Sequence, residues 1–340
     1  MNDLQSSLLL IGGIAIIATL GFNFFQDKRA KKQGSLQHDH SDIDPLLHGD
    51  VRLEPTGQFN EQVQQAYQQN LGNRILDQEL DNGVMEKIFG FVYLSLEQPV
   101  SVTRLSAELN SLNKAGKKNV YIYATLANEE DNGWVPIGSD QTVSNLRFTL
   151  PLTNRKGSLT AIEYSEFLNK VQPLADVFGS HLEFPDMNEL LVKADRLDKL
   201  AANLDALFGL HCVLPVSAEL TSLESDLRSK EWYPDGRHWT KGSADSQLAT
   251  VVIHEAPGKR VLSFNIDLPN CADPIGTLHA IAELGNEFAT KYEGTLMDDA
   301  GRPLTANAFI TIQNQMIERS QALKEAGFKP GNMAAKIIFS

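Results

Sequence analysis

The amino-acid sequence predicts an α+β protein with an N-terminal transmembrane helix, a flexible linker and two tandem domains. Each domain is expected to be an antiparallel-dominated sheet with helices on one face. Three observations lead to this prediction: an uncharged apolar run near the N-terminus, an acidic stretch after it, and a repeated order of elements. The expected bounds are 6–25 for the transmembrane helix, 26–86 for the cytoplasmic linker, 87–207 for the first domain and 208–340 for the second.

The apolar run covers residues 6–25 and carries no charge. At about 1.5 Å per residue it spans roughly 30 Å as a helix, the thickness of a bilayer's hydrocarbon core. Four basic residues follow it: Lys28, Arg29, Lys31 and Lys32. Because only Asp3 precedes the run, the positive-inside rule places the N-terminus outside and the rest of the chain in the cytoplasm. We expect a single-pass protein of the inner membrane whose basic cluster contacts anionic lipids; a cleaved signal peptide is the alternative.

Composition narrows the class of protein further. The net charge of −13 argues against broad nucleic-acid binding, which depends on neutralising phosphates with Lys and Arg. Two cysteines, Cys212 and Cys271, are too few for a disulfide framework, and both are expected to be thiols in a reducing cytoplasm.

The stretch from Gln33 to Glu86 is expected to be a tether in its first half. The whole stretch holds ten acidic residues and only two basic ones, Arg52 and Arg74. Its first half has too few apolar side chains to form a core. Residues 61–80 carry apolar residues at i+4 spacing, which favours a polar helix. A metal site is a second interpretation of one cluster: His38, Asp39, His40, Asp42 and His48. We predict no metal there, because such sites need a folded second shell to orient the imidazoles.

The predicted elements of the first domain begin near Phe89. In order, they are a strand at 91–96, a helix on Val102, Leu105, Leu109 and Leu112, strands at 120–126, 134–137 and 146–152, and helices at 158–178 and 186–207. The second domain repeats this order. It has a strand at 210–216, a helix on Leu220, Leu223 and Leu227, strands at 232–239, 248–253 and 261–268, a helix from Asp273, a short edge strand at 294–299, and a last helix from Thr305 to Gly327.

Two matched pairs of segments indicate an internal duplication. The segment 148–152 corresponds to 264–268 at an offset of 116, and the segment 178–182 corresponds to 292–296 at an offset of 114. A nearly constant offset is typical of a repeat with small insertions. Polar residues alternate with apolar ones along 263–268, which predicts that helices cover only one face of each sheet.

This organisation resembles the ZipA family of membrane-anchored cell-division proteins. The most specific likeness lies within 263–323, where a strand and an apolar helix precede Leu296-Met-Asp-Asp299 and Pro303-Leu-Thr305 opens another helix. The likeness covers the last ~130 residues well and the first domain in outline. The tether is shorter and less proline-rich than is usual in the family, and the duplication is not the family's common form. The resemblance implies an adaptor that binds the C-terminal tail of FtsZ and tethers the division ring to the inner membrane.

In ZipA-like domains that tail lies as a helix in a shallow apolar groove on the exposed sheet face. Strand by strand, the resemblance places the groove of the second domain on His211, Val213, Arg237, Trp239, Val252, His254, Ser263 and Asn265. Trp239 would be the central apolar anchor, while Arg237 and Asn265 replace the apolar side chains expected there. The alternative function is a membrane-anchored scaffold of the same fold that binds another cytoplasmic protein.

The motifs that mark common enzyme and cofactor sites are missing from the sequence, and we predict neither an enzyme nor a cofactor. The nearest constellation is His211, Cys212, His238 and His254, which could serve thiol catalysis or metal binding. Strand alternation argues against it, because Cys212 faces the helices if His211 faces the solvent.

Overall fold

A computed structural model describes residues 80, 82–127, 133–138, 140–243 and 246–340. Its contacts group residues 57–340 into one compact unit, which is the unit described below. Among the described residues, no helix combines the length and apolar character that a membrane crossing requires. The predicted transmembrane helix at 6–25, the basic cluster after it and the linker up to residue 79 lie outside the described residues.

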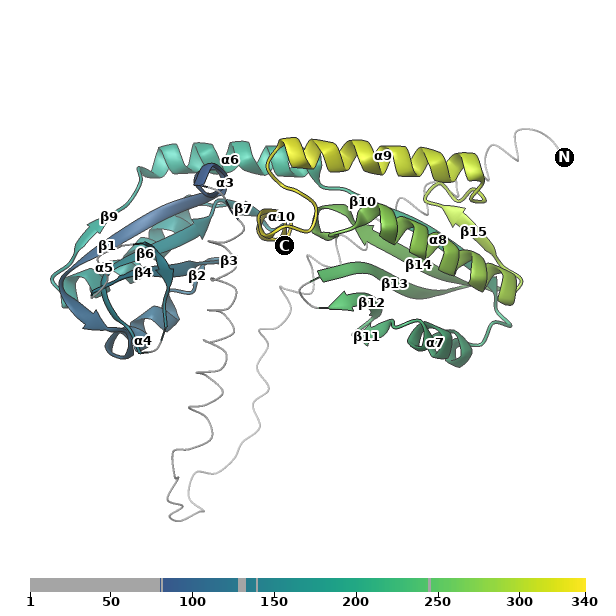
Figure 1. The fold of residues 1–340 in the computed structure, drawn as a ribbon, viewed down its shortest axis with the longest axis horizontal. Helices are drawn as coiled ribbons and strands as arrows, with labels where there is room; N and C mark the ends of the chain where they lie inside the picture. The colour runs from purple at the N-terminus through teal and green to yellow at the C-terminus, as the bar shows by residue number, and fades with distance from the viewer. Residues whose placement is uncertain (1–79, 81, 128–132, 139, 244–245) are drawn as a thin grey trace, which may run out of the picture. The chain divides into compact units, whose positions relative to one another are not determined.

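The first half forms a five-stranded antiparallel sheet in the order β5-β4-β6-β1-β9 (Figure 1). Its elements are α3 (Asn82–Ile88), β1 (Phe89–Ser101), α4 (Val102–Ser111), β2 (Lys114–Ala115), β3 (Lys118–Asn119), β4 (Tyr121–Leu126), β5 (Val135–Pro136), β6 (Thr142–Pro151), β7 (Thr153–Asn154), β8 (Gly157–Ser158), α5 (Ala161–Val177), β9 (His181–Glu183) and α6 (Met187–Leu204).

Helices α5 and α6 pack on one face of this sheet. Val92 of β1 pairs with Phe148 of β6, and the Phe148 ring meets Phe167 of α5 edge to face at 5.8 Å. On β1, Gly90 lets Leu190 of α6 approach closely; a Cβ at Gly90 would come within 2.7 Å of it. We call the opposite side of each sheet its open face.

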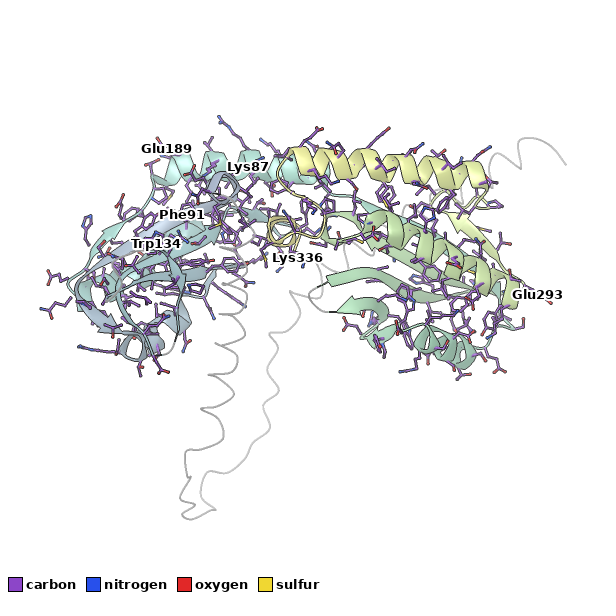
Figure 2. All side chains as sticks on the ribbon, viewed as in Figure 1. Lys87, Phe91, Trp134, Glu189, Glu293 and Lys336 are labelled. Atoms are coloured by element: carbon purple, nitrogen blue, oxygen red, sulfur yellow. The ribbon has the colours of Figure 1, made fainter. Side chains whose placement is uncertain are left out.

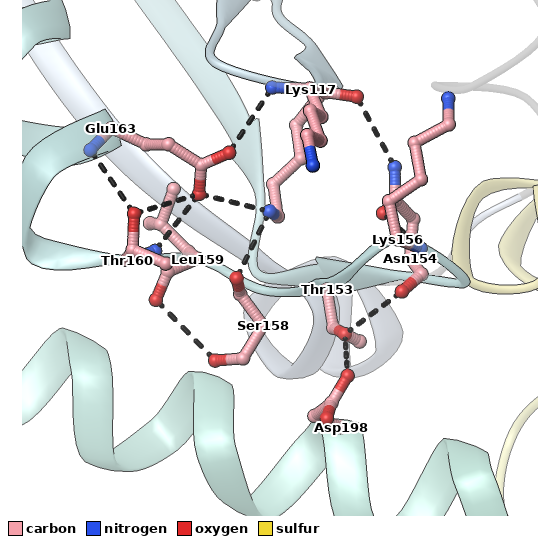
Figure 3. A network of polar contacts seen from close by, with 10 residues as sticks. Lys117, Thr153, Asn154, Lys156, Ser158, Leu159, Thr160, Glu163 and Asp198 are labelled. Carbon is pink, nitrogen blue, oxygen red and sulfur yellow. Dashed lines mark hydrogen bonds and ion pairs between the residues drawn. The ribbon is translucent and has the colours of Figure 1, made fainter. Parts of the chain in front are cut away.

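A polar network holds the start of α5 against the β7–β8 hairpin (Figure 3). Thr160 and Glu163 form a capping box at the N-terminus of α5. The buried Lys118 donates hydrogen bonds to the Ser158 carbonyl at 3.1 Å and to Glu163 at 3.2 Å. Because a buried ammonium without partners would be costly, these contacts fix the position of β3 relative to α5.

The second half forms a six-stranded antiparallel sheet in the order β11-β12-β13-β14-β10-β15. Its elements are β10 (Leu207–Pro215), α7 (Leu220–Ser229), β11 (Tyr233–Asp235), β12 (His238–Ser243), β13 (Ser246–Ala256), β14 (Lys259–Asp267), a 3-10 turn (Leu268–Asn270), α8 (Pro274–Lys291), β15 (Thr295–Asp298), α9 (Ala306–Glu325) and α10 (Met333–Ile338). Helix α8 lies on the face that buries Cys212, whose Sγ is 3.5 Å from the Gly285 carbonyl oxygen.

The predicted α+β class with antiparallel sheets is confirmed, and both halves share a four-strand order. β4-β6-β1-β9 in the first half matches β13-β14-β10-β15 in the second, antiparallel throughout. Phe148 and Phe264, matched at an offset of 116 residues, are both buried centrally. The predicted edge strand at 294–299 is present as β15.

Strand β9 lies between the two predicted helices of the first half and pairs with β1, as β15 pairs with β10; the match of 178–182 with 292–296 indicated this correspondence. Two details differ from the prediction. The first half starts before residue 87, since Leu80 and Met85 are already buried. A further helix, α10, follows Gly327, and its two isoleucines are buried. The helix was not predicted because its six residues are too few to show a helical period in the sequence.

The C-terminal segment joins the two halves. Helix α10 contacts α3 and β7 of the first half, and Lys87 of α3 donates a hydrogen bond to the Ala326 carbonyl. Phe339 is buried against Phe328, with ring centroids 6.0 Å apart. The boundary predicted at residue 207 therefore does not separate two independent cores.

An ion cluster reinforces this junction. Arg155, in the β7–β8 turn, donates two hydrogen bonds to Asp205 at 2.9 and 2.6 Å and two to Asp267 at 2.5 and 2.7 Å. Asp205 lies between α6 and β10, and Asp267 ends β14. Bidentate guanidinium–carboxylate pairs fix orientation as well as distance, so the short link between the halves is held in one geometry.

We expect Phe339→Ala to lower the free energy of unfolding of residues 57–340 by about 3–5 kcal/mol, because it empties a packed aromatic position at the junction. Chemical denaturation monitored by circular dichroism measures this. The control is Ile310→Ala on α9, where the side chain is 54% exposed and the change should stay within about 0.5 kcal/mol. Equal effects of the two substitutions would contradict the packing of the C-terminal segment.

Candidate functional site

Six of the eight residues predicted for the groove do lie together on the open face of the second sheet. One row across the strands joins Val252, Ser263 and His211, and the next row joins His254 and Val213 through Val261. Asn265 lies beside Thr250, one row further along. The alternation of β10, β13 and β14 thus places these side chains as predicted.

The placement of Trp239 on this face is wrong. Trp239 pairs with Val251, and Val251 pairs with Phe264, so all three point toward the helices. Its side chain is only 7% exposed, and the Arg228 guanidinium of α7 stacks on the ring at 4.9 Å. Since side chains alternate every residue along a strand, a shift of one position in the alignment reversed its face.

Arg237 does not lie on the open face either. It precedes β12, in the exposed turn that follows Asp235 and Gly236. Gly236 has a φ of 63°, which favours glycine and makes the turn tight. Residues facing outward on β12 are His238 and Thr240 instead.

The centre of this second open face is polar and internally hydrogen-bonded. His211 lies 3.0 Å from the Ser263 hydroxyl through Nδ1 and 3.0 Å from Asp299 through Nε2. Gly209 makes room for Asp299 and donates its backbone N–H to that carboxylate at 3.2 Å. Binding an apolar helix here would require the desolvation of these groups, which is costly without new hydrogen bonds.

Serine, histidine and aspartate in contact also occur in the catalytic triads of hydrolases. Ser263 is 9% exposed and lies in the middle of β14, which pairs with β10 on one side and β13 on the other. The backbone N–H groups beside it therefore belong to the sheet ladder and do not form an oxyanion hole. The geometry does not support nucleophilic catalysis at Ser263.

Cys212 lies on the opposite face from His211, as alternation predicts. Burial raises the pKa of its thiol to about 12, so that the thiolate needed for nucleophilic attack does not form near neutral pH. Within the described part of the chain, no group of three histidine, cysteine or acidic side chains is placed to hold a metal ion. The metal cluster considered at 38–48 lies outside the described residues.

A cavity of about 670 Å³ lies beside this face, between β10, the loop after β15 and α9. Five of its charged lining residues, Asp205, Asp298, Asp299, Arg302 and Arg319, have partners within the chain. Asp298 binds Arg302 at 2.8 Å, Asp205 binds Arg155, and Arg319 donates to the Asn203 carbonyl at 3.3 Å. These contacts are structural, and they give the cavity no evident chemical function.

The open face of the first sheet is different, because aromatic rings line it. One row runs from Glu183 through Tyr93 and Arg147 to Tyr123 across β9, β1, β6 and β4. Trp134, just before β5, contacts Tyr93 with ring centroids 5.6 Å apart. Figure 2 labels Phe91 and Trp134, which lie near each other on this sheet.

Arg147 occupies the middle of this aromatic cluster. Its guanidinium carbon lies 4.5 Å from the centroid of the Tyr123 ring, 5.0 Å from that of Trp134 and 5.5 Å from that of Phe91. Burial raises the pKa of Tyr121, in the adjoining row, to about 12, so its phenol stays neutral at physiological pH. Tyr123 is fully buried, whereas Phe91, Tyr93 and Trp134 of this cluster are partly exposed.

Sequence reasoning overlooked this cluster. Strands β1 and β4 carry apolar or aromatic residues on both faces, for example Val92 beside Tyr93, so the alternation that identified the second open face is absent. The available signal was the repeated aromatic spacing at i and i+2, in Phe91-Val-Tyr93 and Tyr121-Ile-Tyr123.

Comparison of the sequence with models of known protein families and with curated proteins found no match.

The pH dependence of stability can test the environment of His254. Burial, and then repulsion from His211, lower the pKa of His254, so folding favours its neutral form. Because the unfolded chain takes up this proton more readily, stability should fall as the pH drops below about 6.5. We expect His254→Gln to reduce the loss of stability between pH 7 and pH 5, measured by denaturant unfolding at each pH. His181→Gln, at an exposed position on β9, controls for the loss of an imidazole; an unchanged slope in His254→Gln would contradict the interpretation.

Proposed function

We propose that this protein is a membrane-anchored adaptor of the ZipA type, which binds the C-terminal tail of FtsZ and tethers the division ring to the inner membrane. One observation carries the proposal. The same four-strand antiparallel order occurs twice, and each copy packs helices on one side and has a row of partly exposed side chains on the other. A flat sheet face of this kind suits a short helical peptide, which buries one apolar stripe against it.

The anchor is the second part of the proposal. The uncharged run at 6–25 is long enough to cross a bilayer as a helix, and the basic residues after it orient the chain with its folded part in the cytoplasm. An adaptor needs both parts, because binding alone would not bring a filament to the membrane.

Membrane topology is directly testable. A reporter that is active only in the cytoplasm, fused after Ser340, should be active, because the Lys and Arg bias lies on the C-terminal flank of the run. Replacing Lys28, Arg29, Lys31 and Lys32 with Gln should lower that activity in a fraction of the molecules by making orientation less uniform. A reporter that works only in the periplasm, fused at the same place, is the control, and high activity of that fusion would overturn the proposed orientation.

Tail binding is tested with residues 57–340, because the C-terminal segment ties both halves into one unit. We expect saturable binding of a fluorescent FtsZ tail peptide, measured by anisotropy, and much weaker binding of a scrambled peptide of the same composition. Absence of binding by the folded protein would overturn the FtsZ proposal and favour a scaffold for another cytoplasmic partner.

A further inference from the structure

We propose that the cavity of about 670 Å³ beside β10 receives an extended, basic segment of a partner protein, which adds one strand to the second sheet. This site lies at the edge of the sheet and is separate from the two open faces, so it goes beyond the proposed function. Most charged side chains around the cavity already have partners. The main-chain groups of β10 that face it have none within the described part of the chain, as shown below.

Strand β10 extends beyond the neighbour that covers its outer edge. Its pairing with β15 begins at Leu210, opposite Asp298, whereas its pairing with β14 continues to Leu207, opposite Asp267. Residues 207–209 therefore have a strand on one side only. At about 3.3 Å per residue, roughly 10 Å of edge is open to a further strand.

Two hydrogen bonds show which way the main-chain groups point at this end of β10. The Ala206 carbonyl accepts from the N–H of Leu268 and so points toward the β14 side. The Gly209 N–H donates to Asp299, on the opposite side. Because these directions alternate along an antiparallel strand, the N–H and C=O of Leu207 and the C=O of Gly209 also point outward. Among the residues that the structure describes, these three groups have no hydrogen-bond partner, and such an edge is a template for another strand.

The cavity gives a strand room between β10 and helix α9, which Figure 1 shows beside it. Ile312, Gln315 and Arg319 line it from one face of α9. On the β10 side, Leu207 is 59% exposed and Phe208 is partly exposed, so both walls contain apolar side chains. The volume lies within the range of about 300–1,000 Å³ that is typical of binding pockets.

Charge selects a basic segment. The cavity lining holds more acidic than basic side chains: Asp205, Asp298, Asp299 and Glu318 against Arg302 and Arg319. Glu318 forms no ion pair or hydrogen bond with any described residue, so its charge is available to a ligand. The excess of negative charge attracts lysine or arginine side chains and repels an acidic segment.

The pairing also determines the order of side chains in the added strand. Residues opposite Leu207 and Gly209 would project to the open face, where the side chain of Asp299 is 64% exposed. The residue between them would project to the helix side beside Phe208, whose partner Ile266 is fully buried. Basic and apolar residues should therefore alternate along the segment.

The first test compares two peptides on residues 57–340. A fluorescent peptide of eight alternating lysine and valine residues should bind with saturation, measured by anisotropy. A peptide that alternates glutamate and valine should bind roughly tenfold more weakly, because like charges repel. Equal binding of the two peptides would overturn the assignment of a basic segment, and binding of neither would overturn the site.

Backbone methylation separates strand addition from general attraction to a chain whose net charge is −13. Lysines that pair with Leu207 and Gly209 direct their N–H groups toward β10, whereas the N–H groups of the valines point away. Methylation of the lysine N–H groups should weaken binding about tenfold or more, because two hydrogen bonds are lost. Methylation of the valine N–H groups should have little effect, and equal affinities of the two methylated peptides would contradict strand addition.

Variants of the protein test the location. Leu207→Pro removes one outward N–H at the first residue of β10, where proline is tolerated, and should weaken binding more than Leu207→Ala, which keeps the N–H. Glu318→Gln should weaken binding about threefold, and Glu325→Gln, on the same helix outside the cavity, should leave it unchanged. Thermal melts confirm folding, and Glu318→Gln with the methylated peptides decides the matter if Leu207→Pro does not fold. Unchanged affinity in the folded variants would overturn the location.

A second copy of this chain is the other candidate for the same edge. It would give concentration-dependent dimers in analytical ultracentrifugation that Leu207→Pro disrupts, and this result would overturn the proposal of a partner segment. None of these measurements includes the FtsZ tail. Their failure would therefore leave the proposed function standing, and a failure of FtsZ binding would leave this site standing.

Discussion

The pairing of β6 with β1, repeated as β14 with β10, is the constraint on which the structure depends. In an antiparallel ladder the register decides which side chain of each pair points to the helices, and a slip of one residue exchanges the two faces. Val92 and Phe148 in one sheet, and Leu210 and Phe264 in the other, are fixed on the helix side by this pairing. Once those core contacts form, every residue on the open faces is determined: Tyr93 and Arg147 in the first sheet, His211 and Ser263 in the second.

The junction between the halves makes the duplication one folding unit. Arg155 joins the β7–β8 turn to Asp205 and Asp267, and helix α10, which ends next to Phe339, contacts α3 and β7 of the first half. Burial disfavours a charge at Arg155, but its hydrogen bonds to Asp267 and Asp205 outweigh this and raise its pKa. The arginine therefore remains charged, and the clamp does not depend on pH in the physiological range.

The sequence allowed prediction of much of the fold, because long periodic segments report burial directly. The helix at 186–207 and the strand at 261–268 were recognised by their apolar spacing, and they differ from α6 and β14 by only a few residues. Shorter elements were harder to predict: the three residues of β9 were indicated only by the repeat, and α10 was missed because it is recognisable only through its contacts. The sequence does not show that β12 begins only at His238, after the turn. Without the first residue of a strand, its inward-facing and outward-facing positions cannot be told apart, and Trp239 was therefore assigned to the wrong face. The aromatic face was missed for a related reason, since strands that are apolar on both sides do not reveal which side is open.

The two open faces differ in how far their polar groups already have partners within the chain. On the second sheet, His211, Ser263, Asp299 and Gly209 satisfy one another, so that an apolar partner would have to break or bury existing hydrogen bonds. On the first sheet, Phe91, Tyr93 and Trp134 are partly exposed. Removing their apolar area from water would be favourable by roughly 25 cal/mol per Å². The polar copy contributes most through its core, where Phe264 and Trp232 pack edge to face and β10 continues almost directly from α6. The two copies therefore differ in the chemistry of their faces, although their strand order and their central core positions match.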